Sequence, residues 1–226
     1  MDEATGKKHV EYIEPLVSHL RWPLAGCIDL NADHWIFRGY VIPPPAAAAA
    51  GRKSYYFDAG ASSWNAGGGG PSLSYFSHMW GRHGIHFDEI RAFEMTTPAK
   101  EFHDTVPAAM KKRTFYQQCA VSSTMQGHTQ ATPFIPKLIA DMTEPDSYVL
   151  FKLDIDSPAV ENSQIEYILA NTKNTVAELA YEHHVAGNYL MAPERWGPDC
   201  PKLTLRQSYD VFLNMRKKGI RAHSWI

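Results

Sequence analysis

Acidic side chains follow several apolar runs of this sequence, at the positions where strands would end. Asp58 and Gly60 close an aromatic run, Glu94 closes the next run, and Asp154 and Asp156 follow the most apolar one. In a parallel sheet the carboxyl ends of the strands share one edge, and ligands bind outside it. Carboxylates there can accept hydrogen bonds from hydroxyl or ammonium groups. We therefore expect these acids to contact a ligand.

The turn at residues 58–62 indicates a ligand that contains a ribose. Gly60 lets the backbone approach a ligand closely, because glycine has no Cβ. Glu94 ends the neighbouring predicted strand, where a carboxylate can accept both ribose hydroxyls, as in dinucleotide-binding folds. The glycines at 67–70 precede no Gly-Lys-Ser/Thr, and no G-x-G-x-x-G follows the first strand. The pattern thus favours neither a phosphate-binding loop nor a nicotinamide cofactor.

Two adjacent histidines, His183 and His184, follow a fifth predicted strand that ends at Glu182. Imidazole titrates near neutral pH, so both rings are candidate general bases. Neighbouring residues of an extended chain point to opposite sides, and we expect only one ring to face the site. Asp154, Asp156 and a histidine also form a donor set that could hold a divalent metal ion.

The elements that would position these residues alternate between strand and helix. Such alternation predicts βαβ units and a Rossmann-like α/β sandwich of three layers around a mostly parallel sheet. A capping box, basic residues in the last turn and a following glycine mark the last helix. Thr97 and Ser157 are expected to cap two earlier helices. The predicted strands cover 53–58, 87–94, 113–121, 148–154, 176–182 and 220–226. Two predicted helices cover 71–82 and 205–218, and two further helices are predicted to begin at 97 and 157.

A proline- and alanine-rich stretch divides the chain near residue 50. Residues 43–51 read Pro-Pro-Pro, five alanines and a glycine, which is typical of a surface connector. Residues 1–50 are therefore predicted to be an N-terminal extension with this connector, and 51–226 to be the main domain. Within the extension we expect a helix over 9–20 and a short strand over 34–42.

Composition excludes several classes of protein. The chain has 226 residues, 44% of them hydrophobic, and a formal net charge of −2, so nucleic acid is not an expected partner. No apolar run reaches the roughly 18 residues of a membrane span. Three cysteines without CxxC spacing favour neither a disulfide framework nor a structural zinc site. We expect an intracellular, cytoplasmic setting.

Several segments resemble the FkbM-like family of class I S-adenosylmethionine-dependent methyltransferases, and the resemblance covers about residues 54–226. Residues 56–61 are similar to the family's strand-Asp-x-Gly-Ala motif, and residues 90–94 to the motif that ends in a ribose-binding acid. Residues 151–161 are similar to its Lys-Ile-Asp-Val-Glu-Gly-x-Glu segment. Residues 180–185 and 219–225 resemble a divergent eukaryotic branch.

The resemblance implies a cofactor and a role for each acid. Asp58, Gly60 and Ala61 would hold the methionine end of S-adenosylmethionine, Glu94 its ribose, and Asp154 would lie beside the methionine moiety or the acceptor. The acceptor would be a small molecule or a glycan. The chain departs from the family where Ser62 replaces a further glycine and where residues 156–158 replace Glu-Gly.

Two other hypotheses stay open from the sequence. One is a catalytically silent protein that binds the cofactor or a partner, which the altered motifs favour. The other is a metal-dependent hydrolase that uses Asp154, Asp156 and His183, and whose activity would be independent of S-adenosylmethionine.

Overall fold

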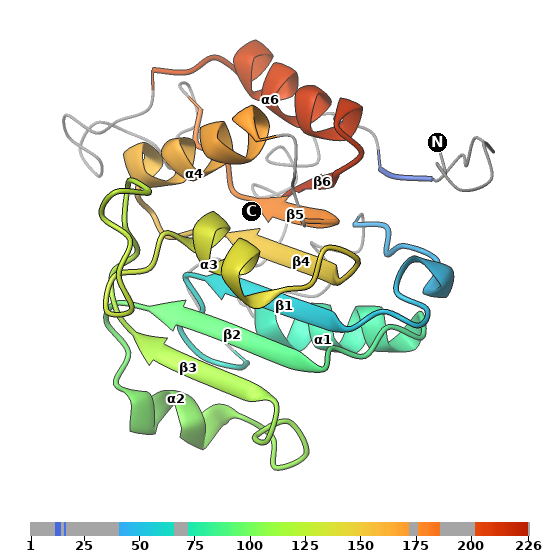
Figure 1. The fold of residues 1–226 in the computed structure, drawn as a ribbon, viewed down its shortest axis with the longest axis vertical. Coiled ribbons are helices and arrows are strands. Elements are labelled where there is room, and N and C mark those ends of the chain that lie inside the picture. The colour runs from blue at the N-terminus through green and yellow to red at the C-terminus, as the bar shows by residue number, and fades with distance from the viewer. Residues whose placement is uncertain are drawn as a thin grey trace, which may run out of the picture.

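The computed structural model describes residues 12–14, 16, 41–65, 72–171, 176–185 and 202–225. Its centre is a six-stranded sheet with the order β3-β2-β1-β4-β5-β6 (Figure 1), and every neighbouring pair is parallel. The α/β prediction is thus confirmed. The strands are β1 (Ser54–Ala59), β2 (Glu89–Glu94), β3 (Thr114–Gln118), β4 (Tyr148–Leu153), β5 (Glu178–Tyr181) and β6 (Arg221–Ser224).

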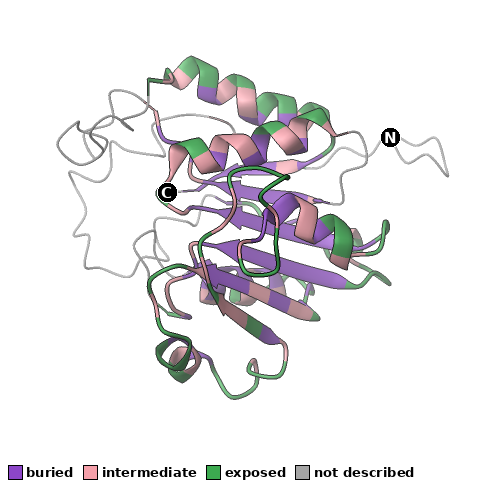
Figure 2. Cartoon of the chain, turned by 60° about the vertical axis from the view of Figure 1, so that its left-hand side comes forward, coloured by how far each residue is buried: buried purple, intermediate pink, exposed green. Residues whose placement is uncertain are grey.

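Helices cover both faces of the sheet and make it the middle of three layers. Alternate strand residues point to opposite faces, so the two faces form two apolar cores. One core packs against α1 (Ser72–Arg82) and α2 (Ala99–Thr105). The other packs against α3 (Ile135–Met142), α4 (Pro158–Ala170) and α6 (Leu205–Lys217). Figure 2 shows the buried strands between helices whose outer sides are exposed.

The central strands explain why the sheet needs both layers. All six residues of β1 and all six of β4 are buried, as expected for strands covered on both faces. On β1, Tyr56 contacts the core beneath α1, whereas Tyr55 and Phe57 contact the core beneath α3, α4 and α6. The nearly continuous apolar run of 148–154 predicted this burial for β4.

The helix ends agree with the predictions only in part. The capping box of α6 is present: the Thr204 hydroxyl accepts from the backbone N–H of Gln207, whose side chain accepts from the N–H of Thr204. The prediction that Thr97 caps a helix was wrong, because the N-cap residue of α2 is Pro98. Ser157 is the N-cap of α4, but its side chain makes no capping hydrogen bond. Helix α3 was not expected.

Parts of the segment before residue 51 contact the main domain. The Glu14 carboxylate lies 2.8 Å from Nδ1 of His223 on β6, and Val41 is buried in the core beneath α1. Within the connector, Ala46–Ala48 form a 3₁₀ helix, η3. Residues 12–14 and 16 are not helical, and residues 41–42 are not in a strand. The rest of the predicted helix and strand lies outside the described residues. No helix in the described part of the chain has the length and apolar character needed to cross a membrane.

Candidate functional site at the carboxyl ends of the strands

The predicted acids lie where the sheet reverses its order of strands. The chain runs outward from β1 through β2 to β3, and in the opposite direction from β4 through β5 to β6. Ligands of such sheets bind outside the carboxyl ends of the strands at this point. Four adjacent strands end here, and each has an acidic residue at or just after its end. We call these acidic residues the carboxylate edge: Asp58, Glu94, Asp154, Asp156 and Glu182.

A buried lysine joins two of these acids. The Lys152 ammonium on β4 lies 3.4 Å from Oδ1 of Asp58 and 3.0 Å from Oδ2 of Asp154, and all three residues are buried. Burial lowers the pKa of Lys152, but the charges of Asp154 and Asp58 outweigh burial and raise it above its ordinary value. Burial likewise raises the pKa of Asp154, and Lys152 more than offsets this and lowers it. The three groups form a charged cluster between β1 and β4.

Asp58 is bound from within the protein. Its Oδ2 accepts hydrogen bonds from the Tyr56 hydroxyl at 2.5 Å and from the Ser72 hydroxyl at 2.7 Å. The residue is 0% exposed. Asp58 therefore joins the end of β1 to the start of α1. Because Asp58 itself is fully buried, a ligand would contact the turn that follows it, which begins at Gly60.

That turn depends on Gly60. Its φ is +87°, and a Cβ on it would lie 1.6 Å from the carbonyl oxygen of Asp154. The N–H groups of Gly60 and Ala61 both donate to the carbonyl oxygen of Phe93, at 2.9 and 3.1 Å. The turn is thereby held between the ends of β2 and β4, and only glycine fits at its first position.

Glu94 lies beside the same turn. Its Oε1 accepts hydrogen bonds from the backbone N–H and the hydroxyl of Thr96, and its Oε2 accepts from the N–H of Ser62 at 3.4 Å. Burial raises the pKa of this half-buried carboxyl, but the hydrogen bonds from Thr96 and Ser62 outweigh burial and lower it. Glu94 is therefore a charged acceptor next to a glycine turn, and its long bond to Ser62 leaves Oε2 weakly engaged.

The two histidines face different surroundings. Nδ1 of His183 is 3.0 Å from the Ser208 hydroxyl on α6, and its ring stacks on Tyr181. The buried Nε2 of His184 lies 3.5 Å from Glu182, 3.8 Å from Glu161 and 3.9 Å from Asp156. His184 is thus the ring that the fold brings to the carboxylate edge, and His183 packs toward α6.

The acids around His184 hold their protons more strongly than isolated carboxyls. Burial and then the charge of Asp154 raise the pKa of Glu182 well above its ordinary value. Burial raises the pKa of Glu161 to about 8. The predicted metal pair Asp154 and Asp156 is divided, because Asp154 contacts Lys152 and Trp225 whereas Asp156 faces His184.

Sequence reasoning did not single out Lys152 and Glu161 for the roles they have here. Lys152 stands inside the most apolar strand of the chain, and a lysine buried on such a strand must pair with acids. Glu161 lies in the first turn of α4, and its Oε1 accepts from the N–H of Ile155. The signal for Lys152 was available, whereas the approach of Glu161 to His184 depends on how α4 packs.

No family model, curated protein or solved structure matches this chain. Its function must therefore be inferred from the residues along the carboxylate edge.

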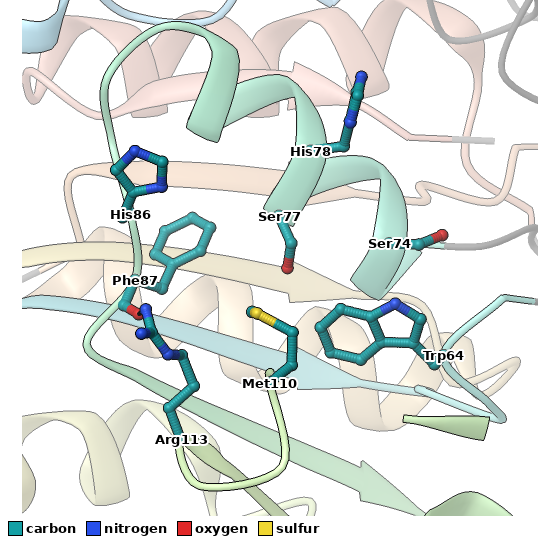
Figure 3. A pocket seen from close by; sticks show the side chains of 8 residues that line it. All are labelled: Trp64, Ser74, Ser77, His78, His86, Phe87, Met110 and Arg113. Atoms are coloured by element: carbon teal, nitrogen blue, oxygen red, sulfur yellow. Dashed lines mark hydrogen bonds between the residues drawn. The ribbon is translucent and has the colours of Figure 1, made fainter. Parts of the chain in front are cut away.

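A separate cavity lies on the face of the sheet that α1 covers. It encloses about 360 Å³. Figure 3 shows Ser77 of α1 and Met110 on facing sides of it, with Trp64 beside Met110. None of the predicted site residues lines it. The lining residues are Trp64, Ser74, Ser77, His78, His86, Phe87, Met110 and Arg113.

Proposed function

We propose that this chain binds S-adenosylmethionine at the carboxylate edge and transfers its methyl group to an oxygen of a small molecule or glycan. One observation carries the proposal: Glu94, a charged carboxylate, lies at the end of β2 beside the turn that begins at Gly60. This pairing of an acid with a glycine turn at the strand-order reversal suits the ribose of a nucleoside.

The charge of the edge supports a cationic ligand. Burial and then the charges of Asp154 and Glu94 raise the pKa of Asp156, so these three acids influence one another. The lysine beside them is held by Asp58 and Asp154. A ligand with a sulfonium and an ammonium group would be attracted by such a surface. The sulfonium of S-adenosylmethionine supplies an electrophilic methyl group when the cofactor is bound, so the protein's main task is to align an acceptor with it.

An oxygen acceptor must also lose its proton, and His184 is the imidazole that lies among the acids. Burial lowers the pKa of His184 more than the charge of Asp154 raises it. The ring is therefore neutral near pH 7, and one ring nitrogen keeps a lone pair for a proton or a metal ion. The hydrolase hypothesis needed His183, whose contacts with Ser208 and Tyr181 do not favour it.

Calorimetric titration of the whole chain tests the proposal. We expect S-adenosylmethionine and its demethylated product to bind, and NAD⁺ not to bind, because no G-x-G-x-x-G follows β1. Binding of NAD⁺ in place of S-adenosylmethionine, or of neither, would overturn the proposal. Binding without methyl transfer to any of a broad panel of hydroxyl acceptors would instead favour a catalytically silent cofactor-binding protein.

A further inference from the structure

We propose that Asp156, Glu182 and His184 form a binding site for a divalent transition-metal ion, with Mn²⁺ as the representative ion. Each residue offers one ligand atom, and these three atoms lie within 4.8 Å of one another. Asp156 follows β4, and Glu182 and His184 follow β5, so two neighbouring strands supply the donors. Small side-chain movements would bring all three onto one ion.

A second observation at the same place points to a missing binding partner. Glu161 is 0% exposed, and its Oε2 has no hydrogen-bond partner. This oxygen lies 3.8 Å from Nε2 of His184. A buried carboxyl oxygen without a hydrogen bond costs free energy unless another group binds it. A metal ion on His184 would supply that partner and make Glu161 an outer-shell contact or a fourth ligand.

The donor set determines the class of ion. Two carboxylates and one imidazole suit Mn²⁺, Fe²⁺ or Zn²⁺, whereas Ca²⁺ and Mg²⁺ prefer oxygen ligands alone. Asp154 is not needed, because Lys152 already neutralises it. The side chain of Asp156 is 71% exposed, so one side of the cluster is open to water or to a substrate oxygen.

This metal site does not depend on S-adenosylmethionine, and it can be tested without it. The whole chain is freed of metal with a chelator and titrated with MnCl₂, and free Mn²⁺ is measured from its aqueous electron paramagnetic resonance signal. We expect one Mn²⁺ per chain. Asp156→Asn should weaken binding by about tenfold or more, because a charged ligand is lost. Asn accepts the left-handed backbone at residue 156, where φ is +55°, so this variant should fold.

The matched control is Asp146→Asn, which changes an exposed aspartate before β4. It should bind Mn²⁺ like the wild type. Glu161→Gln and His184→Gln should both weaken binding, and circular dichroism shows whether these buried variants fold. A wild type that leaves Mn²⁺ free, or an Asp156→Asn variant that binds as tightly as the wild type, would overturn the proposal.

Discussion

The carbonyl oxygen of Asp154 occupies the space where a side chain on Gly60 would begin, 1.6 Å from the ideal Cβ position. Gly60 also has a φ of +87°, so two independent constraints require glycine at the end of β1. We predict that Gly60→Ala lowers the free energy of unfolding by at least about 2 kcal/mol, because the β1–β4 contact must open. Urea denaturation measures the loss.

Gly51 provides the control for that substitution. Its φ is +71°, but nothing lies within 4 Å of the Cβ position, so Gly51→Ala meets only backbone strain. That strain costs about 1–2 kcal/mol. Equal losses for the two variants would show that the close approach to Asp154 has no energetic consequence.

Removal of the buried lysine should destabilise the protein strongly. Lys152→Met leaves Asp58 and Asp154 without the ammonium that contacts both, at 3.4 and 3.0 Å. Loss of one partner of a buried ion pair costs about 3–5 kcal/mol. Chemical denaturation at neutral pH measures this.

The comparison variant is Lys100→Met on α2, which removes an exposed ion pair with Asp104. Exposed pairs contribute little, so this variant should unfold at the midpoint of the wild type. If Lys152→Met behaved like Lys100→Met, the charged cluster would have no part in stability.

The contact between Glu14 and His223 should make stability depend on pH. Burial lowers the pKa of His223, but its interactions with Glu14 and Glu178 outweigh burial and raise the pKa above 6.5. Burial raises the pKa of Glu14, and the interactions with His223 outweigh this and lower it below 4.5. Arg216 also faces Glu14, at 3.5 Å.

The stabilising effect of this contact is therefore greatest in mildly acidic solution, where His223 is protonated and Glu14 is ionised. The contribution of His223 to stability is complete below pH 6.5 and is lost as pH rises through its raised pKa. The contribution of Glu14 to stability is complete above pH 4.5 and is lost as pH falls through its lowered pKa. Glu14→Gln should therefore cost about 1.5–3 kcal/mol near pH 5.5 and less as the solution becomes alkaline. A difference from wild type that stays constant between about pH 5 and 9 would contradict this.

The fold could be predicted because its strongest signals are local. The apolar run of β4 and the capping box of α6 each depend on a few adjacent residues. Helix α3 has only eight residues and a proline in its first turn, so it is shorter than the roughly 11 residues over which helical periodicity is normally recognised. Thr97 was predicted as a cap from its residue type alone, whereas α2 begins one residue later, with Pro98 at the N-cap position.

The candidate site was predictable in position but not in pairing. The carboxyl ends of parallel strands share one edge of the sheet, and this indicated where Asp58, Glu94 and Asp154 would lie. It could not show that Lys152 neutralises two of these acids, since that contact joins β1 to β4 across 94 residues of chain. The different surroundings of His183 and His184 likewise depend on where α6 and α4 pack.

The proposed role of Glu94 in binding the ribose can be measured directly. Calorimetric titration of S-adenosylmethionine should give binding to Glu94→Ala that is weaker by about 1–3 kcal/mol than binding to wild type, because a charged hydrogen-bond acceptor is removed. Glu101→Ala, which removes an exposed glutamate from the first turn of α2, should bind like the wild type. Equal affinities in all three proteins would contradict the placement of the nucleoside beside Gly60 and Glu94.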